Sequence, residues 1–97
     1  MIERDYLVEL YEIYKNLLTD REKEYFEYYY FEDYSLNEIA EVYDVSKSYV
    51  SKFLNQISEE IISFENKLSL YNKRQKIKKV IDSIDVDTKS KIEELLW

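Results

Sequence analysis

The sequence contains no glycine and no proline in its 97 residues. Small strand-rich domains need these two residues at hairpin turns and bulges, whereas helices can be joined through Asn, Asp and Ser. The absence of both therefore predicts an all-α fold. A chain of this length corresponds to one domain, so we expect residues 1–97 to form a single helical domain.

Cysteine and histidine are absent as well. The usual ligands of zinc, haem and iron-sulfur centres are therefore missing, and so are Ser-His and Cys-His nucleophile pairs. Without glycine there is no phosphate-binding loop of the P-loop or Rossmann type. Adjacent carboxylates such as Glu59 and Glu60 point about 100° apart on a helix and do not converge on one site. We expect a protein that is not an enzyme and uses no cofactor.

The start of the chain gives no sign of a targeting signal. Residues 1–5 do not have the basic and then apolar order of a signal peptide. No run of about 18 or more apolar residues occurs anywhere. We therefore expect a cytoplasmic protein without a membrane span.

Charge is distributed unevenly along the chain, whose net charge is −7. Residues 1–44 carry a net charge of −9, residues 45–79 a net charge of +5 and residues 80–97 a net charge of −3. A basic segment within an acidic protein retains local attraction for phosphate groups. The overall acidity therefore does not exclude a nucleic-acid partner.

Local signals predict where the helices begin. Residues 19–22 (Thr-Asp-Arg-Glu) and 35–38 (Ser-Leu-Asn-Glu) have the form of a capping box, in which a hydroxyl and a carboxylate bind each other's backbone amides. Ser46 offers a third N-cap. With the apolar spacing, these signals predict an N-terminal helix of about four turns, then helices over residues 20–32 and 36–43. A long helix from Ser46 and two shorter C-terminal helices follow, the last of them containing Ile92, Leu95, Leu96 and Trp97.

Residues 36–55 match the pattern of a helix-turn-helix, in which two helices cross steeply through a short turn. Ala40, the only alanine of the chain, stands where the two helices must approach closely. Asp44 stands at the turn position usually held by glycine, and aspartate tolerates the left-handed conformation better than most residues. We expect a helix-turn-helix of the winged-helix-like superclass, followed by a helical extension over residues 56–97. The apolar positions of the pattern are filled by Ile39, Tyr43, Val45, Val50 and Phe53.

A helix-turn-helix that reads double-stranded DNA places the N-terminal part of its second helix in the major groove. Lys52 and Asn55 suit base edges, because lysine donates to guanine acceptors and asparagine pairs with adenine. Lys47, Ser48 and Tyr49 more naturally hold phosphate. The alternative is an ordinary solvated helix face, which contains the same residue types. The predicted DNA-binding residues are Lys47, Ser48, Tyr49, Ser51, Lys52 and Asn55.

A second cluster of positive charge lies at residues 73–79, where five of seven residues are basic. One interpretation is contact with the phosphates of RNA or DNA. The other is that these charges offset the acidic first half of the chain within the fold. The candidate phosphate-contacting residues are Lys73, Arg74, Lys76, Lys78 and Lys79.

After Ser46, apolar residues follow one another at alternating steps of four and three, the pattern of a heptad ladder. One interpretation is the seam of a homodimer, which a helix-turn-helix needs in order to read a palindrome. The other is an internal strip against which other helices of the same chain pack. Asn66 or Ser69 are candidate breaks in this helix. The ladder consists of Val50, Leu54, Ile57, Ile61, Phe64, Leu68 and Tyr71.

The chain closely resembles the YlxM family of small bacterial helix-turn-helix proteins over residues 10–41, which read LYEIYKNLLTDREKEYFEYYYFEDYSLNEIAE. The resemblance continues through FENKLSLYNKRQKI at residues 64–77. The capped helix, the acid-plus-Ser step and the Glu-Ile-Ala segment also look like the promoter-reading region four of bacterial sigma factors. The family resemblance implies a role in, or regulation of, the signal recognition particle pathway. Two functions follow as expectations: a DNA-binding regulatory protein, or an adaptor that contacts the particle's protein or RNA without binding DNA.

Overall fold

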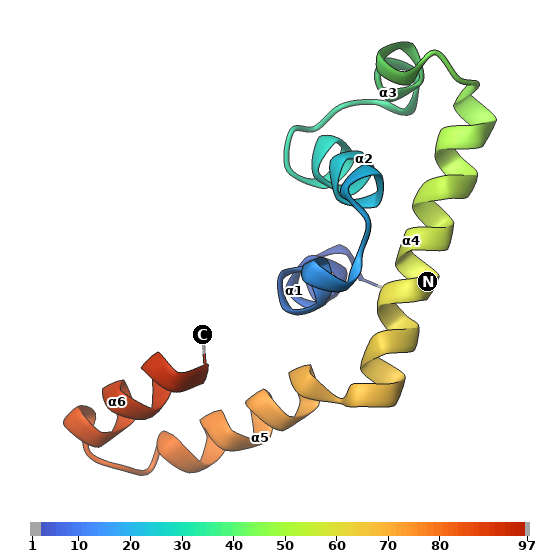
Figure 1. Cartoon of the computed structure of the whole chain (residues 1–97). Helices are drawn as coiled ribbons and strands as arrows, with labels where there is room; N and C mark the ends of the chain where they lie inside the picture. Colours follow the sequence, from blue (N-terminus) through green and yellow to red (C-terminus); the bar gives the residue numbers. More distant parts are fainter. Residues whose placement is uncertain (1–2, 97) are drawn as a thin grey trace.

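A computed structural model describes residues 3–96, which form six α-helices and one short 3-10 helix (Figure 1). No strand occurs between residues 3 and 96, so the predicted all-α fold is confirmed and the helix-turn-helix there carries no β-wing. None of the helices in this range is long and apolar enough to cross a membrane. Trp97, placed by the prediction in the last helix, lies outside the described residues, as do Met1 and Ile2. The elements are α1 (Arg4–Tyr14), η1 (Lys15–Leu17), α2 (Asp20–Tyr30), α3 (Leu36–Tyr43), α4 (Lys47–Leu68), α5 (Leu70–Ile81) and α6 (Val86–Leu96).

Both predicted capping boxes are confirmed. The Thr19 hydroxyl accepts a hydrogen bond from the backbone amide of Glu22 at 3.2 Å, and the Glu22 carboxylate accepts one from the Thr19 amide at 2.9 Å. Ser35 and Glu38 repeat this exchange at the start of α3, at 3.1 and 3.0 Å. The Ser46 hydroxyl accepts a backbone hydrogen bond at the start of α4. Three helices therefore begin where local chemistry predicts, because each cap satisfies amides that the helix leaves without partners.

Helix α2 ends at Tyr30, two residues before the predicted end near Glu32. The Glu32 amide donates to the Glu27 carbonyl at 3.0 Å, and the next residue, Asp33, has a positive φ of 55°. The left-handed residue turns the chain out of the helix and toward α3.

Helix α4 is the longest element, and helices α1, α2 and α3 all pack against it (Figure 1). The first four rungs of the predicted ladder are buried within this single chain. This half of the ladder is therefore internal core and not a dimer seam. Its buried residues are Val50, Leu54, Ile57 and Ile61.

The second half of the ladder does not form a continuous seam, because α4 ends at Leu68. Ser69, one of the two predicted break points, has left-handed backbone angles (φ 55°, ψ 31°) and redirects the chain into α5. Phe64 and Tyr71 lie on different helices but both pack against tyrosine rings of α1, with ring centroids 5.9 and 5.1 Å apart. Helix α1 thus covers Phe64 and Tyr71, whereas Leu68 remains 44% exposed.

A buried carboxylate joins α1, α4 and α5. Glu65 of α4 is only 9% exposed and accepts a hydrogen bond from the Tyr14 hydroxyl at 2.5 Å. It also accepts the backbone amides of Tyr71 and Asn72, in the first turn of α5, at 3.1 and 3.2 Å. The Tyr14 oxygen in turn accepts the Leu70 amide at 3.1 Å. Burial and the hydrogen bond to Glu65 raise the pKa of Tyr14 to about 12, so this hydroxyl remains a donor at neutral pH.

We call the group formed by Glu65, Tyr14, Leu70, Tyr71 and Asn72 the Glu65 junction. In it, a side chain of α4 caps the N-terminus of the neighbouring helix α5. The negative charge of Glu65 lies at the positive end of the α5 dipole. The junction therefore determines the direction in which α5 leaves α4.

Two carboxyl groups meet between α2 and α4. The hydrogen bond between Glu60 and Glu22, together with burial and charge repulsion, raises the pKa of Glu60 to about 7. Burial acts against ionisation of Glu22 too, but hydrogen bonds from Glu60 and Thr19 outweigh it and lower the pKa of Glu22. Glu60 therefore holds the proton of the pair.

The Glu60→Gln variant should be more stable than the wild type at pH 8, because glutamine carries no charge beside Glu22. The expected gain is only about 1 kcal/mol, since solvent screens this partly exposed pair. Folding raises the pKa of Glu60 from 4.5, its value in the unfolded chain, to about 7. The protonated carboxyl group therefore contributes its full stabilisation below pH 4.5, and this stabilisation is lost as the pH rises through about 7. Urea unfolding at pH 4.5 and pH 8 measures this difference. Glu59→Gln, an exposed neighbour on the same helix, is the control. An equal effect of Glu60→Gln at both pH values would contradict the prediction.

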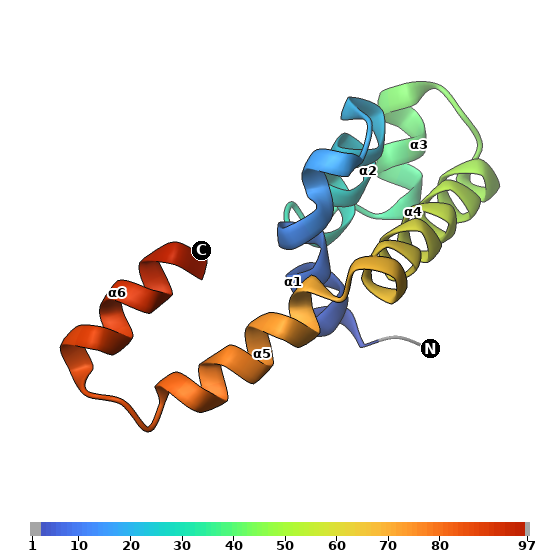
Figure 2. The ribbon, with the colours of Figure 1, turned by 60° about the horizontal axis from the view of Figure 1, so that its bottom comes forward.

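Helices α5 and α6 form a C-terminal arm (residues 70–96) that leaves the body of the molecule (Figure 2). The molecule is elongated, with extents of 53 × 25 × 23 Å. Its radius of gyration is 16.6 Å, against about 12.5 Å for a compact chain of this length. Apolar side chains stay in solvent on this arm, including Val80 (63% exposed), Val86 (76%) and Leu95 (88%).

Candidate nucleic-acid interface

The helix-turn-helix consists of α3, the turn at residues 44–46 and the first half of α4. Asp44 adopts the predicted left-handed conformation, with φ 53° and ψ 51°. The next residue, Val45, donates its backbone amide to the Ala40 carbonyl at 3.0 Å and closes the end of α3. Ala40 is buried, as expected for a small residue where α3 packs against α4.

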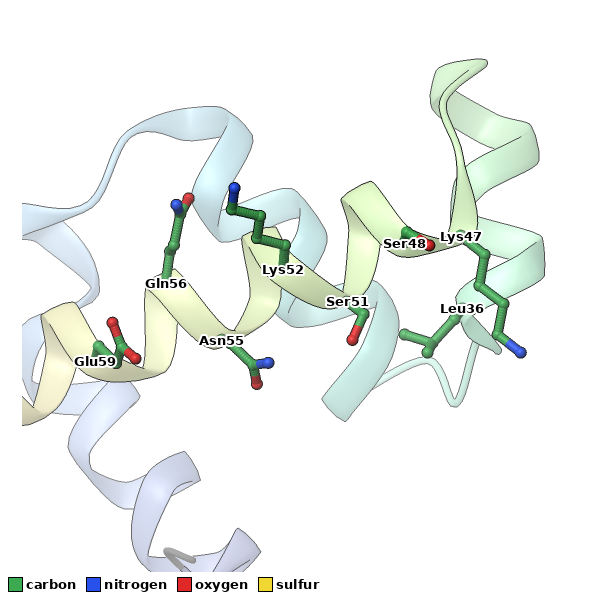
Figure 3. A pocket seen from close by; sticks show the side chains of 8 residues that line it. All are labelled: Leu36, Lys47, Ser48, Ser51, Lys52, Asn55, Gln56 and Glu59. Atoms are coloured by element: carbon green, nitrogen blue, oxygen red, sulfur yellow. The ribbon is translucent and has the colours of Figure 1, made fainter.

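An open groove of about 630 Å³ lies along the exposed face of α4 (Figure 3). Five of the six predicted DNA-binding residues line it, together with Leu36 from the start of α3. Ser51 and Asn55 extend to one side of the helix, whereas Lys52 and Gln56 extend to the other (Figure 3). The complete lining is Leu36, Lys47, Ser48, Ser51, Lys52, Asn55, Gln56 and Glu59.

Tyr49 is the predicted residue that does not line this groove. Its ring stacks on Phe53 with centroids 5.8 Å apart and meets the edge of Tyr25 at 6.5 Å. The side chain is still 45% exposed, beside the groove on the flank of α4.

Three lining residues were not predicted. Gln56 and Glu59 follow Lys52 and Asn55 by four residues, so helical periodicity places them on the same face. The prediction ended at residue 55 with the helix-turn-helix pattern and therefore missed them. Leu36 joins the groove through tertiary packing of α3, for which sequence spacing gives no signal.

Comparison with known proteins identifies the group to which this helix-turn-helix belongs. Residues 1–96 match the model of the UPF0122 family, which is described as "Putative helix-turn-helix protein, YlxM / p13 like". The chain belongs to the YlxM / p13-like family. The resemblance inferred from residues 10–41 is thereby confirmed and extends to nearly the whole chain.

Individual members of the YlxM / p13-like family are similar at 39 to 45% identity. The UPF0122 protein of Ureaplasma urealyticum serovar 10 is 45% identical over 74 residues, which cover 76% of this chain and 75% of the relative. That of Mycoplasma capricolum is 39% identical over 97 aligned residues, covering 94% and 86%. That of Caldanaerobacter subterraneus is 43% identical over 75 residues, covering 77% and 64%.

The positive charge in the groove of this YlxM / p13-like protein is concentrated at its N-terminal end. Lys47 and Lys52 project from the first two turns of α4, and the first turn contains no acidic residue. The ion pairs among residues 3–96 involve other cations, so both ammonium groups are available to a ligand. The positive end of the α4 dipole adds to this attraction. At the other end Glu59 contributes a carboxylate, which repels phosphate.

The second predicted site, at residues 73–79, lies within α5, and its basic residues fall on two different faces of this helix. Arg74 and Lys78 are half-buried and already engaged, and Lys78 lines a cleft with Glu9 and Glu12 of α1. This part of the run lies beside the acidic first helix. The groove lies along residues 47–59 of α4, and the rest of this helix adds about 14 Å between the end of the groove and the start of α5. The exposed face of the run consists of Lys73, Lys76 and Lys79.

Proposed function

We propose that this YlxM / p13-like chain is a non-enzymatic, cytoplasmic regulatory protein that binds double-stranded DNA through the start of α4. The observation that supports this most directly is the groove on α4, in which five residues chosen from the helix-turn-helix pattern lie together. The N-terminal part of a recognition helix is the part that enters the major groove. Lys47 and Lys52 form no ion pair within residues 3–96, and together with the helix dipole they favour a polyanion at this end.

Within this proposal, Lys52 and Asn55 read base edges, while Lys47 and Ser48 bind phosphate. Gln56 joins them as an additional candidate reader, because its amide can pair with adenine in the same way as asparagine. Tyr49, on the flank of α4, is positioned for the phosphate backbone beside the groove.

Substitution of the two lysines separates base reading from phosphate binding. Lys52→Ala should lose about 1–3 kcal/mol of discrimination at one base pair of a selected duplex. Lys47→Ala should weaken selected and random duplexes alike and reduce the salt dependence of binding by about one ion. Fluorescence anisotropy at several salt concentrations measures both, with exposed Lys91→Ala on α6 as the control. If both variants bind every duplex as the wild type does, the proposed interface is wrong.

The proposal includes a homodimer, because a single recognition helix with two lysines makes too few phosphate contacts for tight binding. A dimer doubles these contacts and matches a DNA site with two-fold symmetry. The buried half of the ladder is already covered within one chain, so the dimer contact must lie elsewhere.

A second candidate function is an adaptor that contacts the protein or RNA of the signal recognition particle. The exposed lysines of α5, far from the groove, favour it, together with the family resemblance. A tagged pull-down from cell lysate, with and without nucleases, decides between the two. A DNA fragment lost on DNase treatment supports the regulator, whereas particle protein or RNA that survives DNase supports the adaptor.

A further inference from the structure

The outer face of α5 combines positive charge with exposed apolar surface. Lys73, Lys76 and Lys79 follow one another at steps of three, so they share one side of the helix with Val80, which is 63% exposed. The ammonium groups of these three lysines form no ion pair within residues 3–96, where the ion pairs involve other cations. We call this surface the lysine face.

The outer side of α2 has the opposite character. A groove of about 230 Å³ there is formed by three carboxylates and two phenol rings, which together suit a lysine ammonium through ion pairing and cation–π contact. Tyr43 donates to Glu24 at 2.7 Å and Tyr11 donates to Glu27, so two of these carboxylates are held in place. Phe31, which precedes Glu32 in the chain and meets the Tyr11 ring edge-on, is 42% exposed. The lining of this acidic groove is Glu24, Glu27, Tyr28, Glu32 and Tyr34.

The two surfaces do not meet within one chain. Figures 1 and 2 both show α5 leaving the lower end of α4 and running away from α2. The Glu65 junction maintains this direction, because it holds the first turn of α5 against α1 and α4. The lysine face can therefore meet such an acidic groove only on another molecule.

We propose that the lysine face of one copy docks on the acidic groove of a second copy, and the reverse, in a two-fold symmetric homodimer with exchanged arms. This inference rests on the dimer part of the proposed function. A second copy is the occupant that the charges favour, because residues 1–44 carry a net charge of −9 and residues 45–79 one of +5. Two-fold exchange makes each contact twice and covers Val80 with the partner's Phe31 region. Neither surface includes a residue of the α4 groove, which stays open to DNA.

A charge exchange in the full chain tests this arrangement. Lys76→Glu and Glu32→Lys should each raise the dissociation constant of the dimer about tenfold, and the doubly substituted chain should return to within about threefold of the wild type. Glu32 is suitable because its side chain makes no hydrogen bond or ion pair with another residue between 3 and 96, so its replacement leaves the fold intact. Sedimentation equilibrium gives the constants. Lys91→Glu and Glu41→Lys are matched controls, since both residues are exposed and lie outside the two surfaces.

Several outcomes would overturn the inference. A wild-type chain that stays monomeric at every concentration would exclude the dimer. A chain that assembles into open-ended polymers would exclude the two-fold symmetric arrangement, because that arrangement closes at two copies. If the doubly substituted chain has the same dissociation constant as the single variants, the protein is a dimer but other surfaces form it. Loss of binding to a single-stranded RNA oligonucleotide in Lys76→Glu, with an unchanged dimer constant, would assign the lysine face to RNA instead. Binding of all variants to a single DNA half-site tests the recognition helix independently of these results.

Discussion

Replacing Glu65 with alanine is expected to lower the free energy of unfolding by about 3 kcal/mol and to release α5 from the body. The change leaves the Tyr14 hydroxyl and the amides of Tyr71 and Asn72 without their acceptor in a buried site. Hydrogen bonds to a charged group are the stronger kind, and donors that lose such a partner keep the cost of their desolvation.

Two further variants grade this effect. Tyr14→Phe removes one donor to Glu65 and the acceptor of the Leu70 amide, so it should cost about half as much. Asn66→Ala, at the exposed residue next to Glu65, should change stability by no more than a few tenths of a kcal/mol.

Urea unfolding and amide hydrogen exchange measure the two consequences separately. The amides of Tyr71 and Asn72 should exchange faster in Glu65→Ala than the amides in the middle of α4. An unfolding midpoint equal to that of Asn66→Ala would show that the junction contributes nothing.

Ile61→Ala should destabilise the protein by about 2–5 kcal/mol, and by the same amount at every protein concentration. Ile61 is fully buried on α4 at the level of α1, so its truncation leaves a cavity inside one chain. If Ile61 lay at a dimer interface, the loss of stability in Ile61→Ala would depend on protein concentration, because unfolding would be coupled to dissociation.

Thermal unfolding of Ile61→Ala over about a hundredfold range of concentration checks this point. The comparison variant is Leu68→Ala, a ladder position that is 44% exposed and should cost far less. If Ile61→Ala were mild and strongly dependent on concentration, the ladder would have to be reassigned to an interface.

Sequence reasoning succeeded where the signal is local. A capping box spans four residues and satisfies its own amides, so Thr19 and Ser35 identify helix starts without knowledge of the rest of the chain. The turn of the helix-turn-helix was equally readable, because Asp44 tolerates a left-handed backbone that most side chains avoid.

Sequence reasoning failed where partners are distant. Glu65 looks like an ordinary surface acid of an amphipathic helix, and its burial depends on Tyr14, which lies 51 residues earlier. The same limit applies to the pairing of Glu22 with Glu60 across α2 and α4. The choice between internal core and dimer seam for the ladder also needed the positions of α1, α2 and α3.

The candidate site was predictable to the extent that it follows one helix. Lys47, Ser51 and Asn55 lie on one face by periodicity alone, and the structure places them in one groove. The contribution of Leu36 comes from α3, and the separation of Tyr49 from the groove comes from its packing on Phe53. Both depend on tertiary contacts.

The uninterrupted length of α4 has a mechanical consequence. A single helix of 22 residues, without glycine or proline, joins the helix-turn-helix to the arm. One residue inserted between positions 58 and 64 would turn the following residues by about 100° relative to the helix-turn-helix and lengthen α4 by about 1.5 Å. It would also carry Glu65 away from Tyr14, so the arm would lose its present direction. Under the proposed dimer and DNA contact, the number of residues in α4 would therefore set the angle and the distance between the two helix-turn-helix units, and with them the spacing of two half-sites.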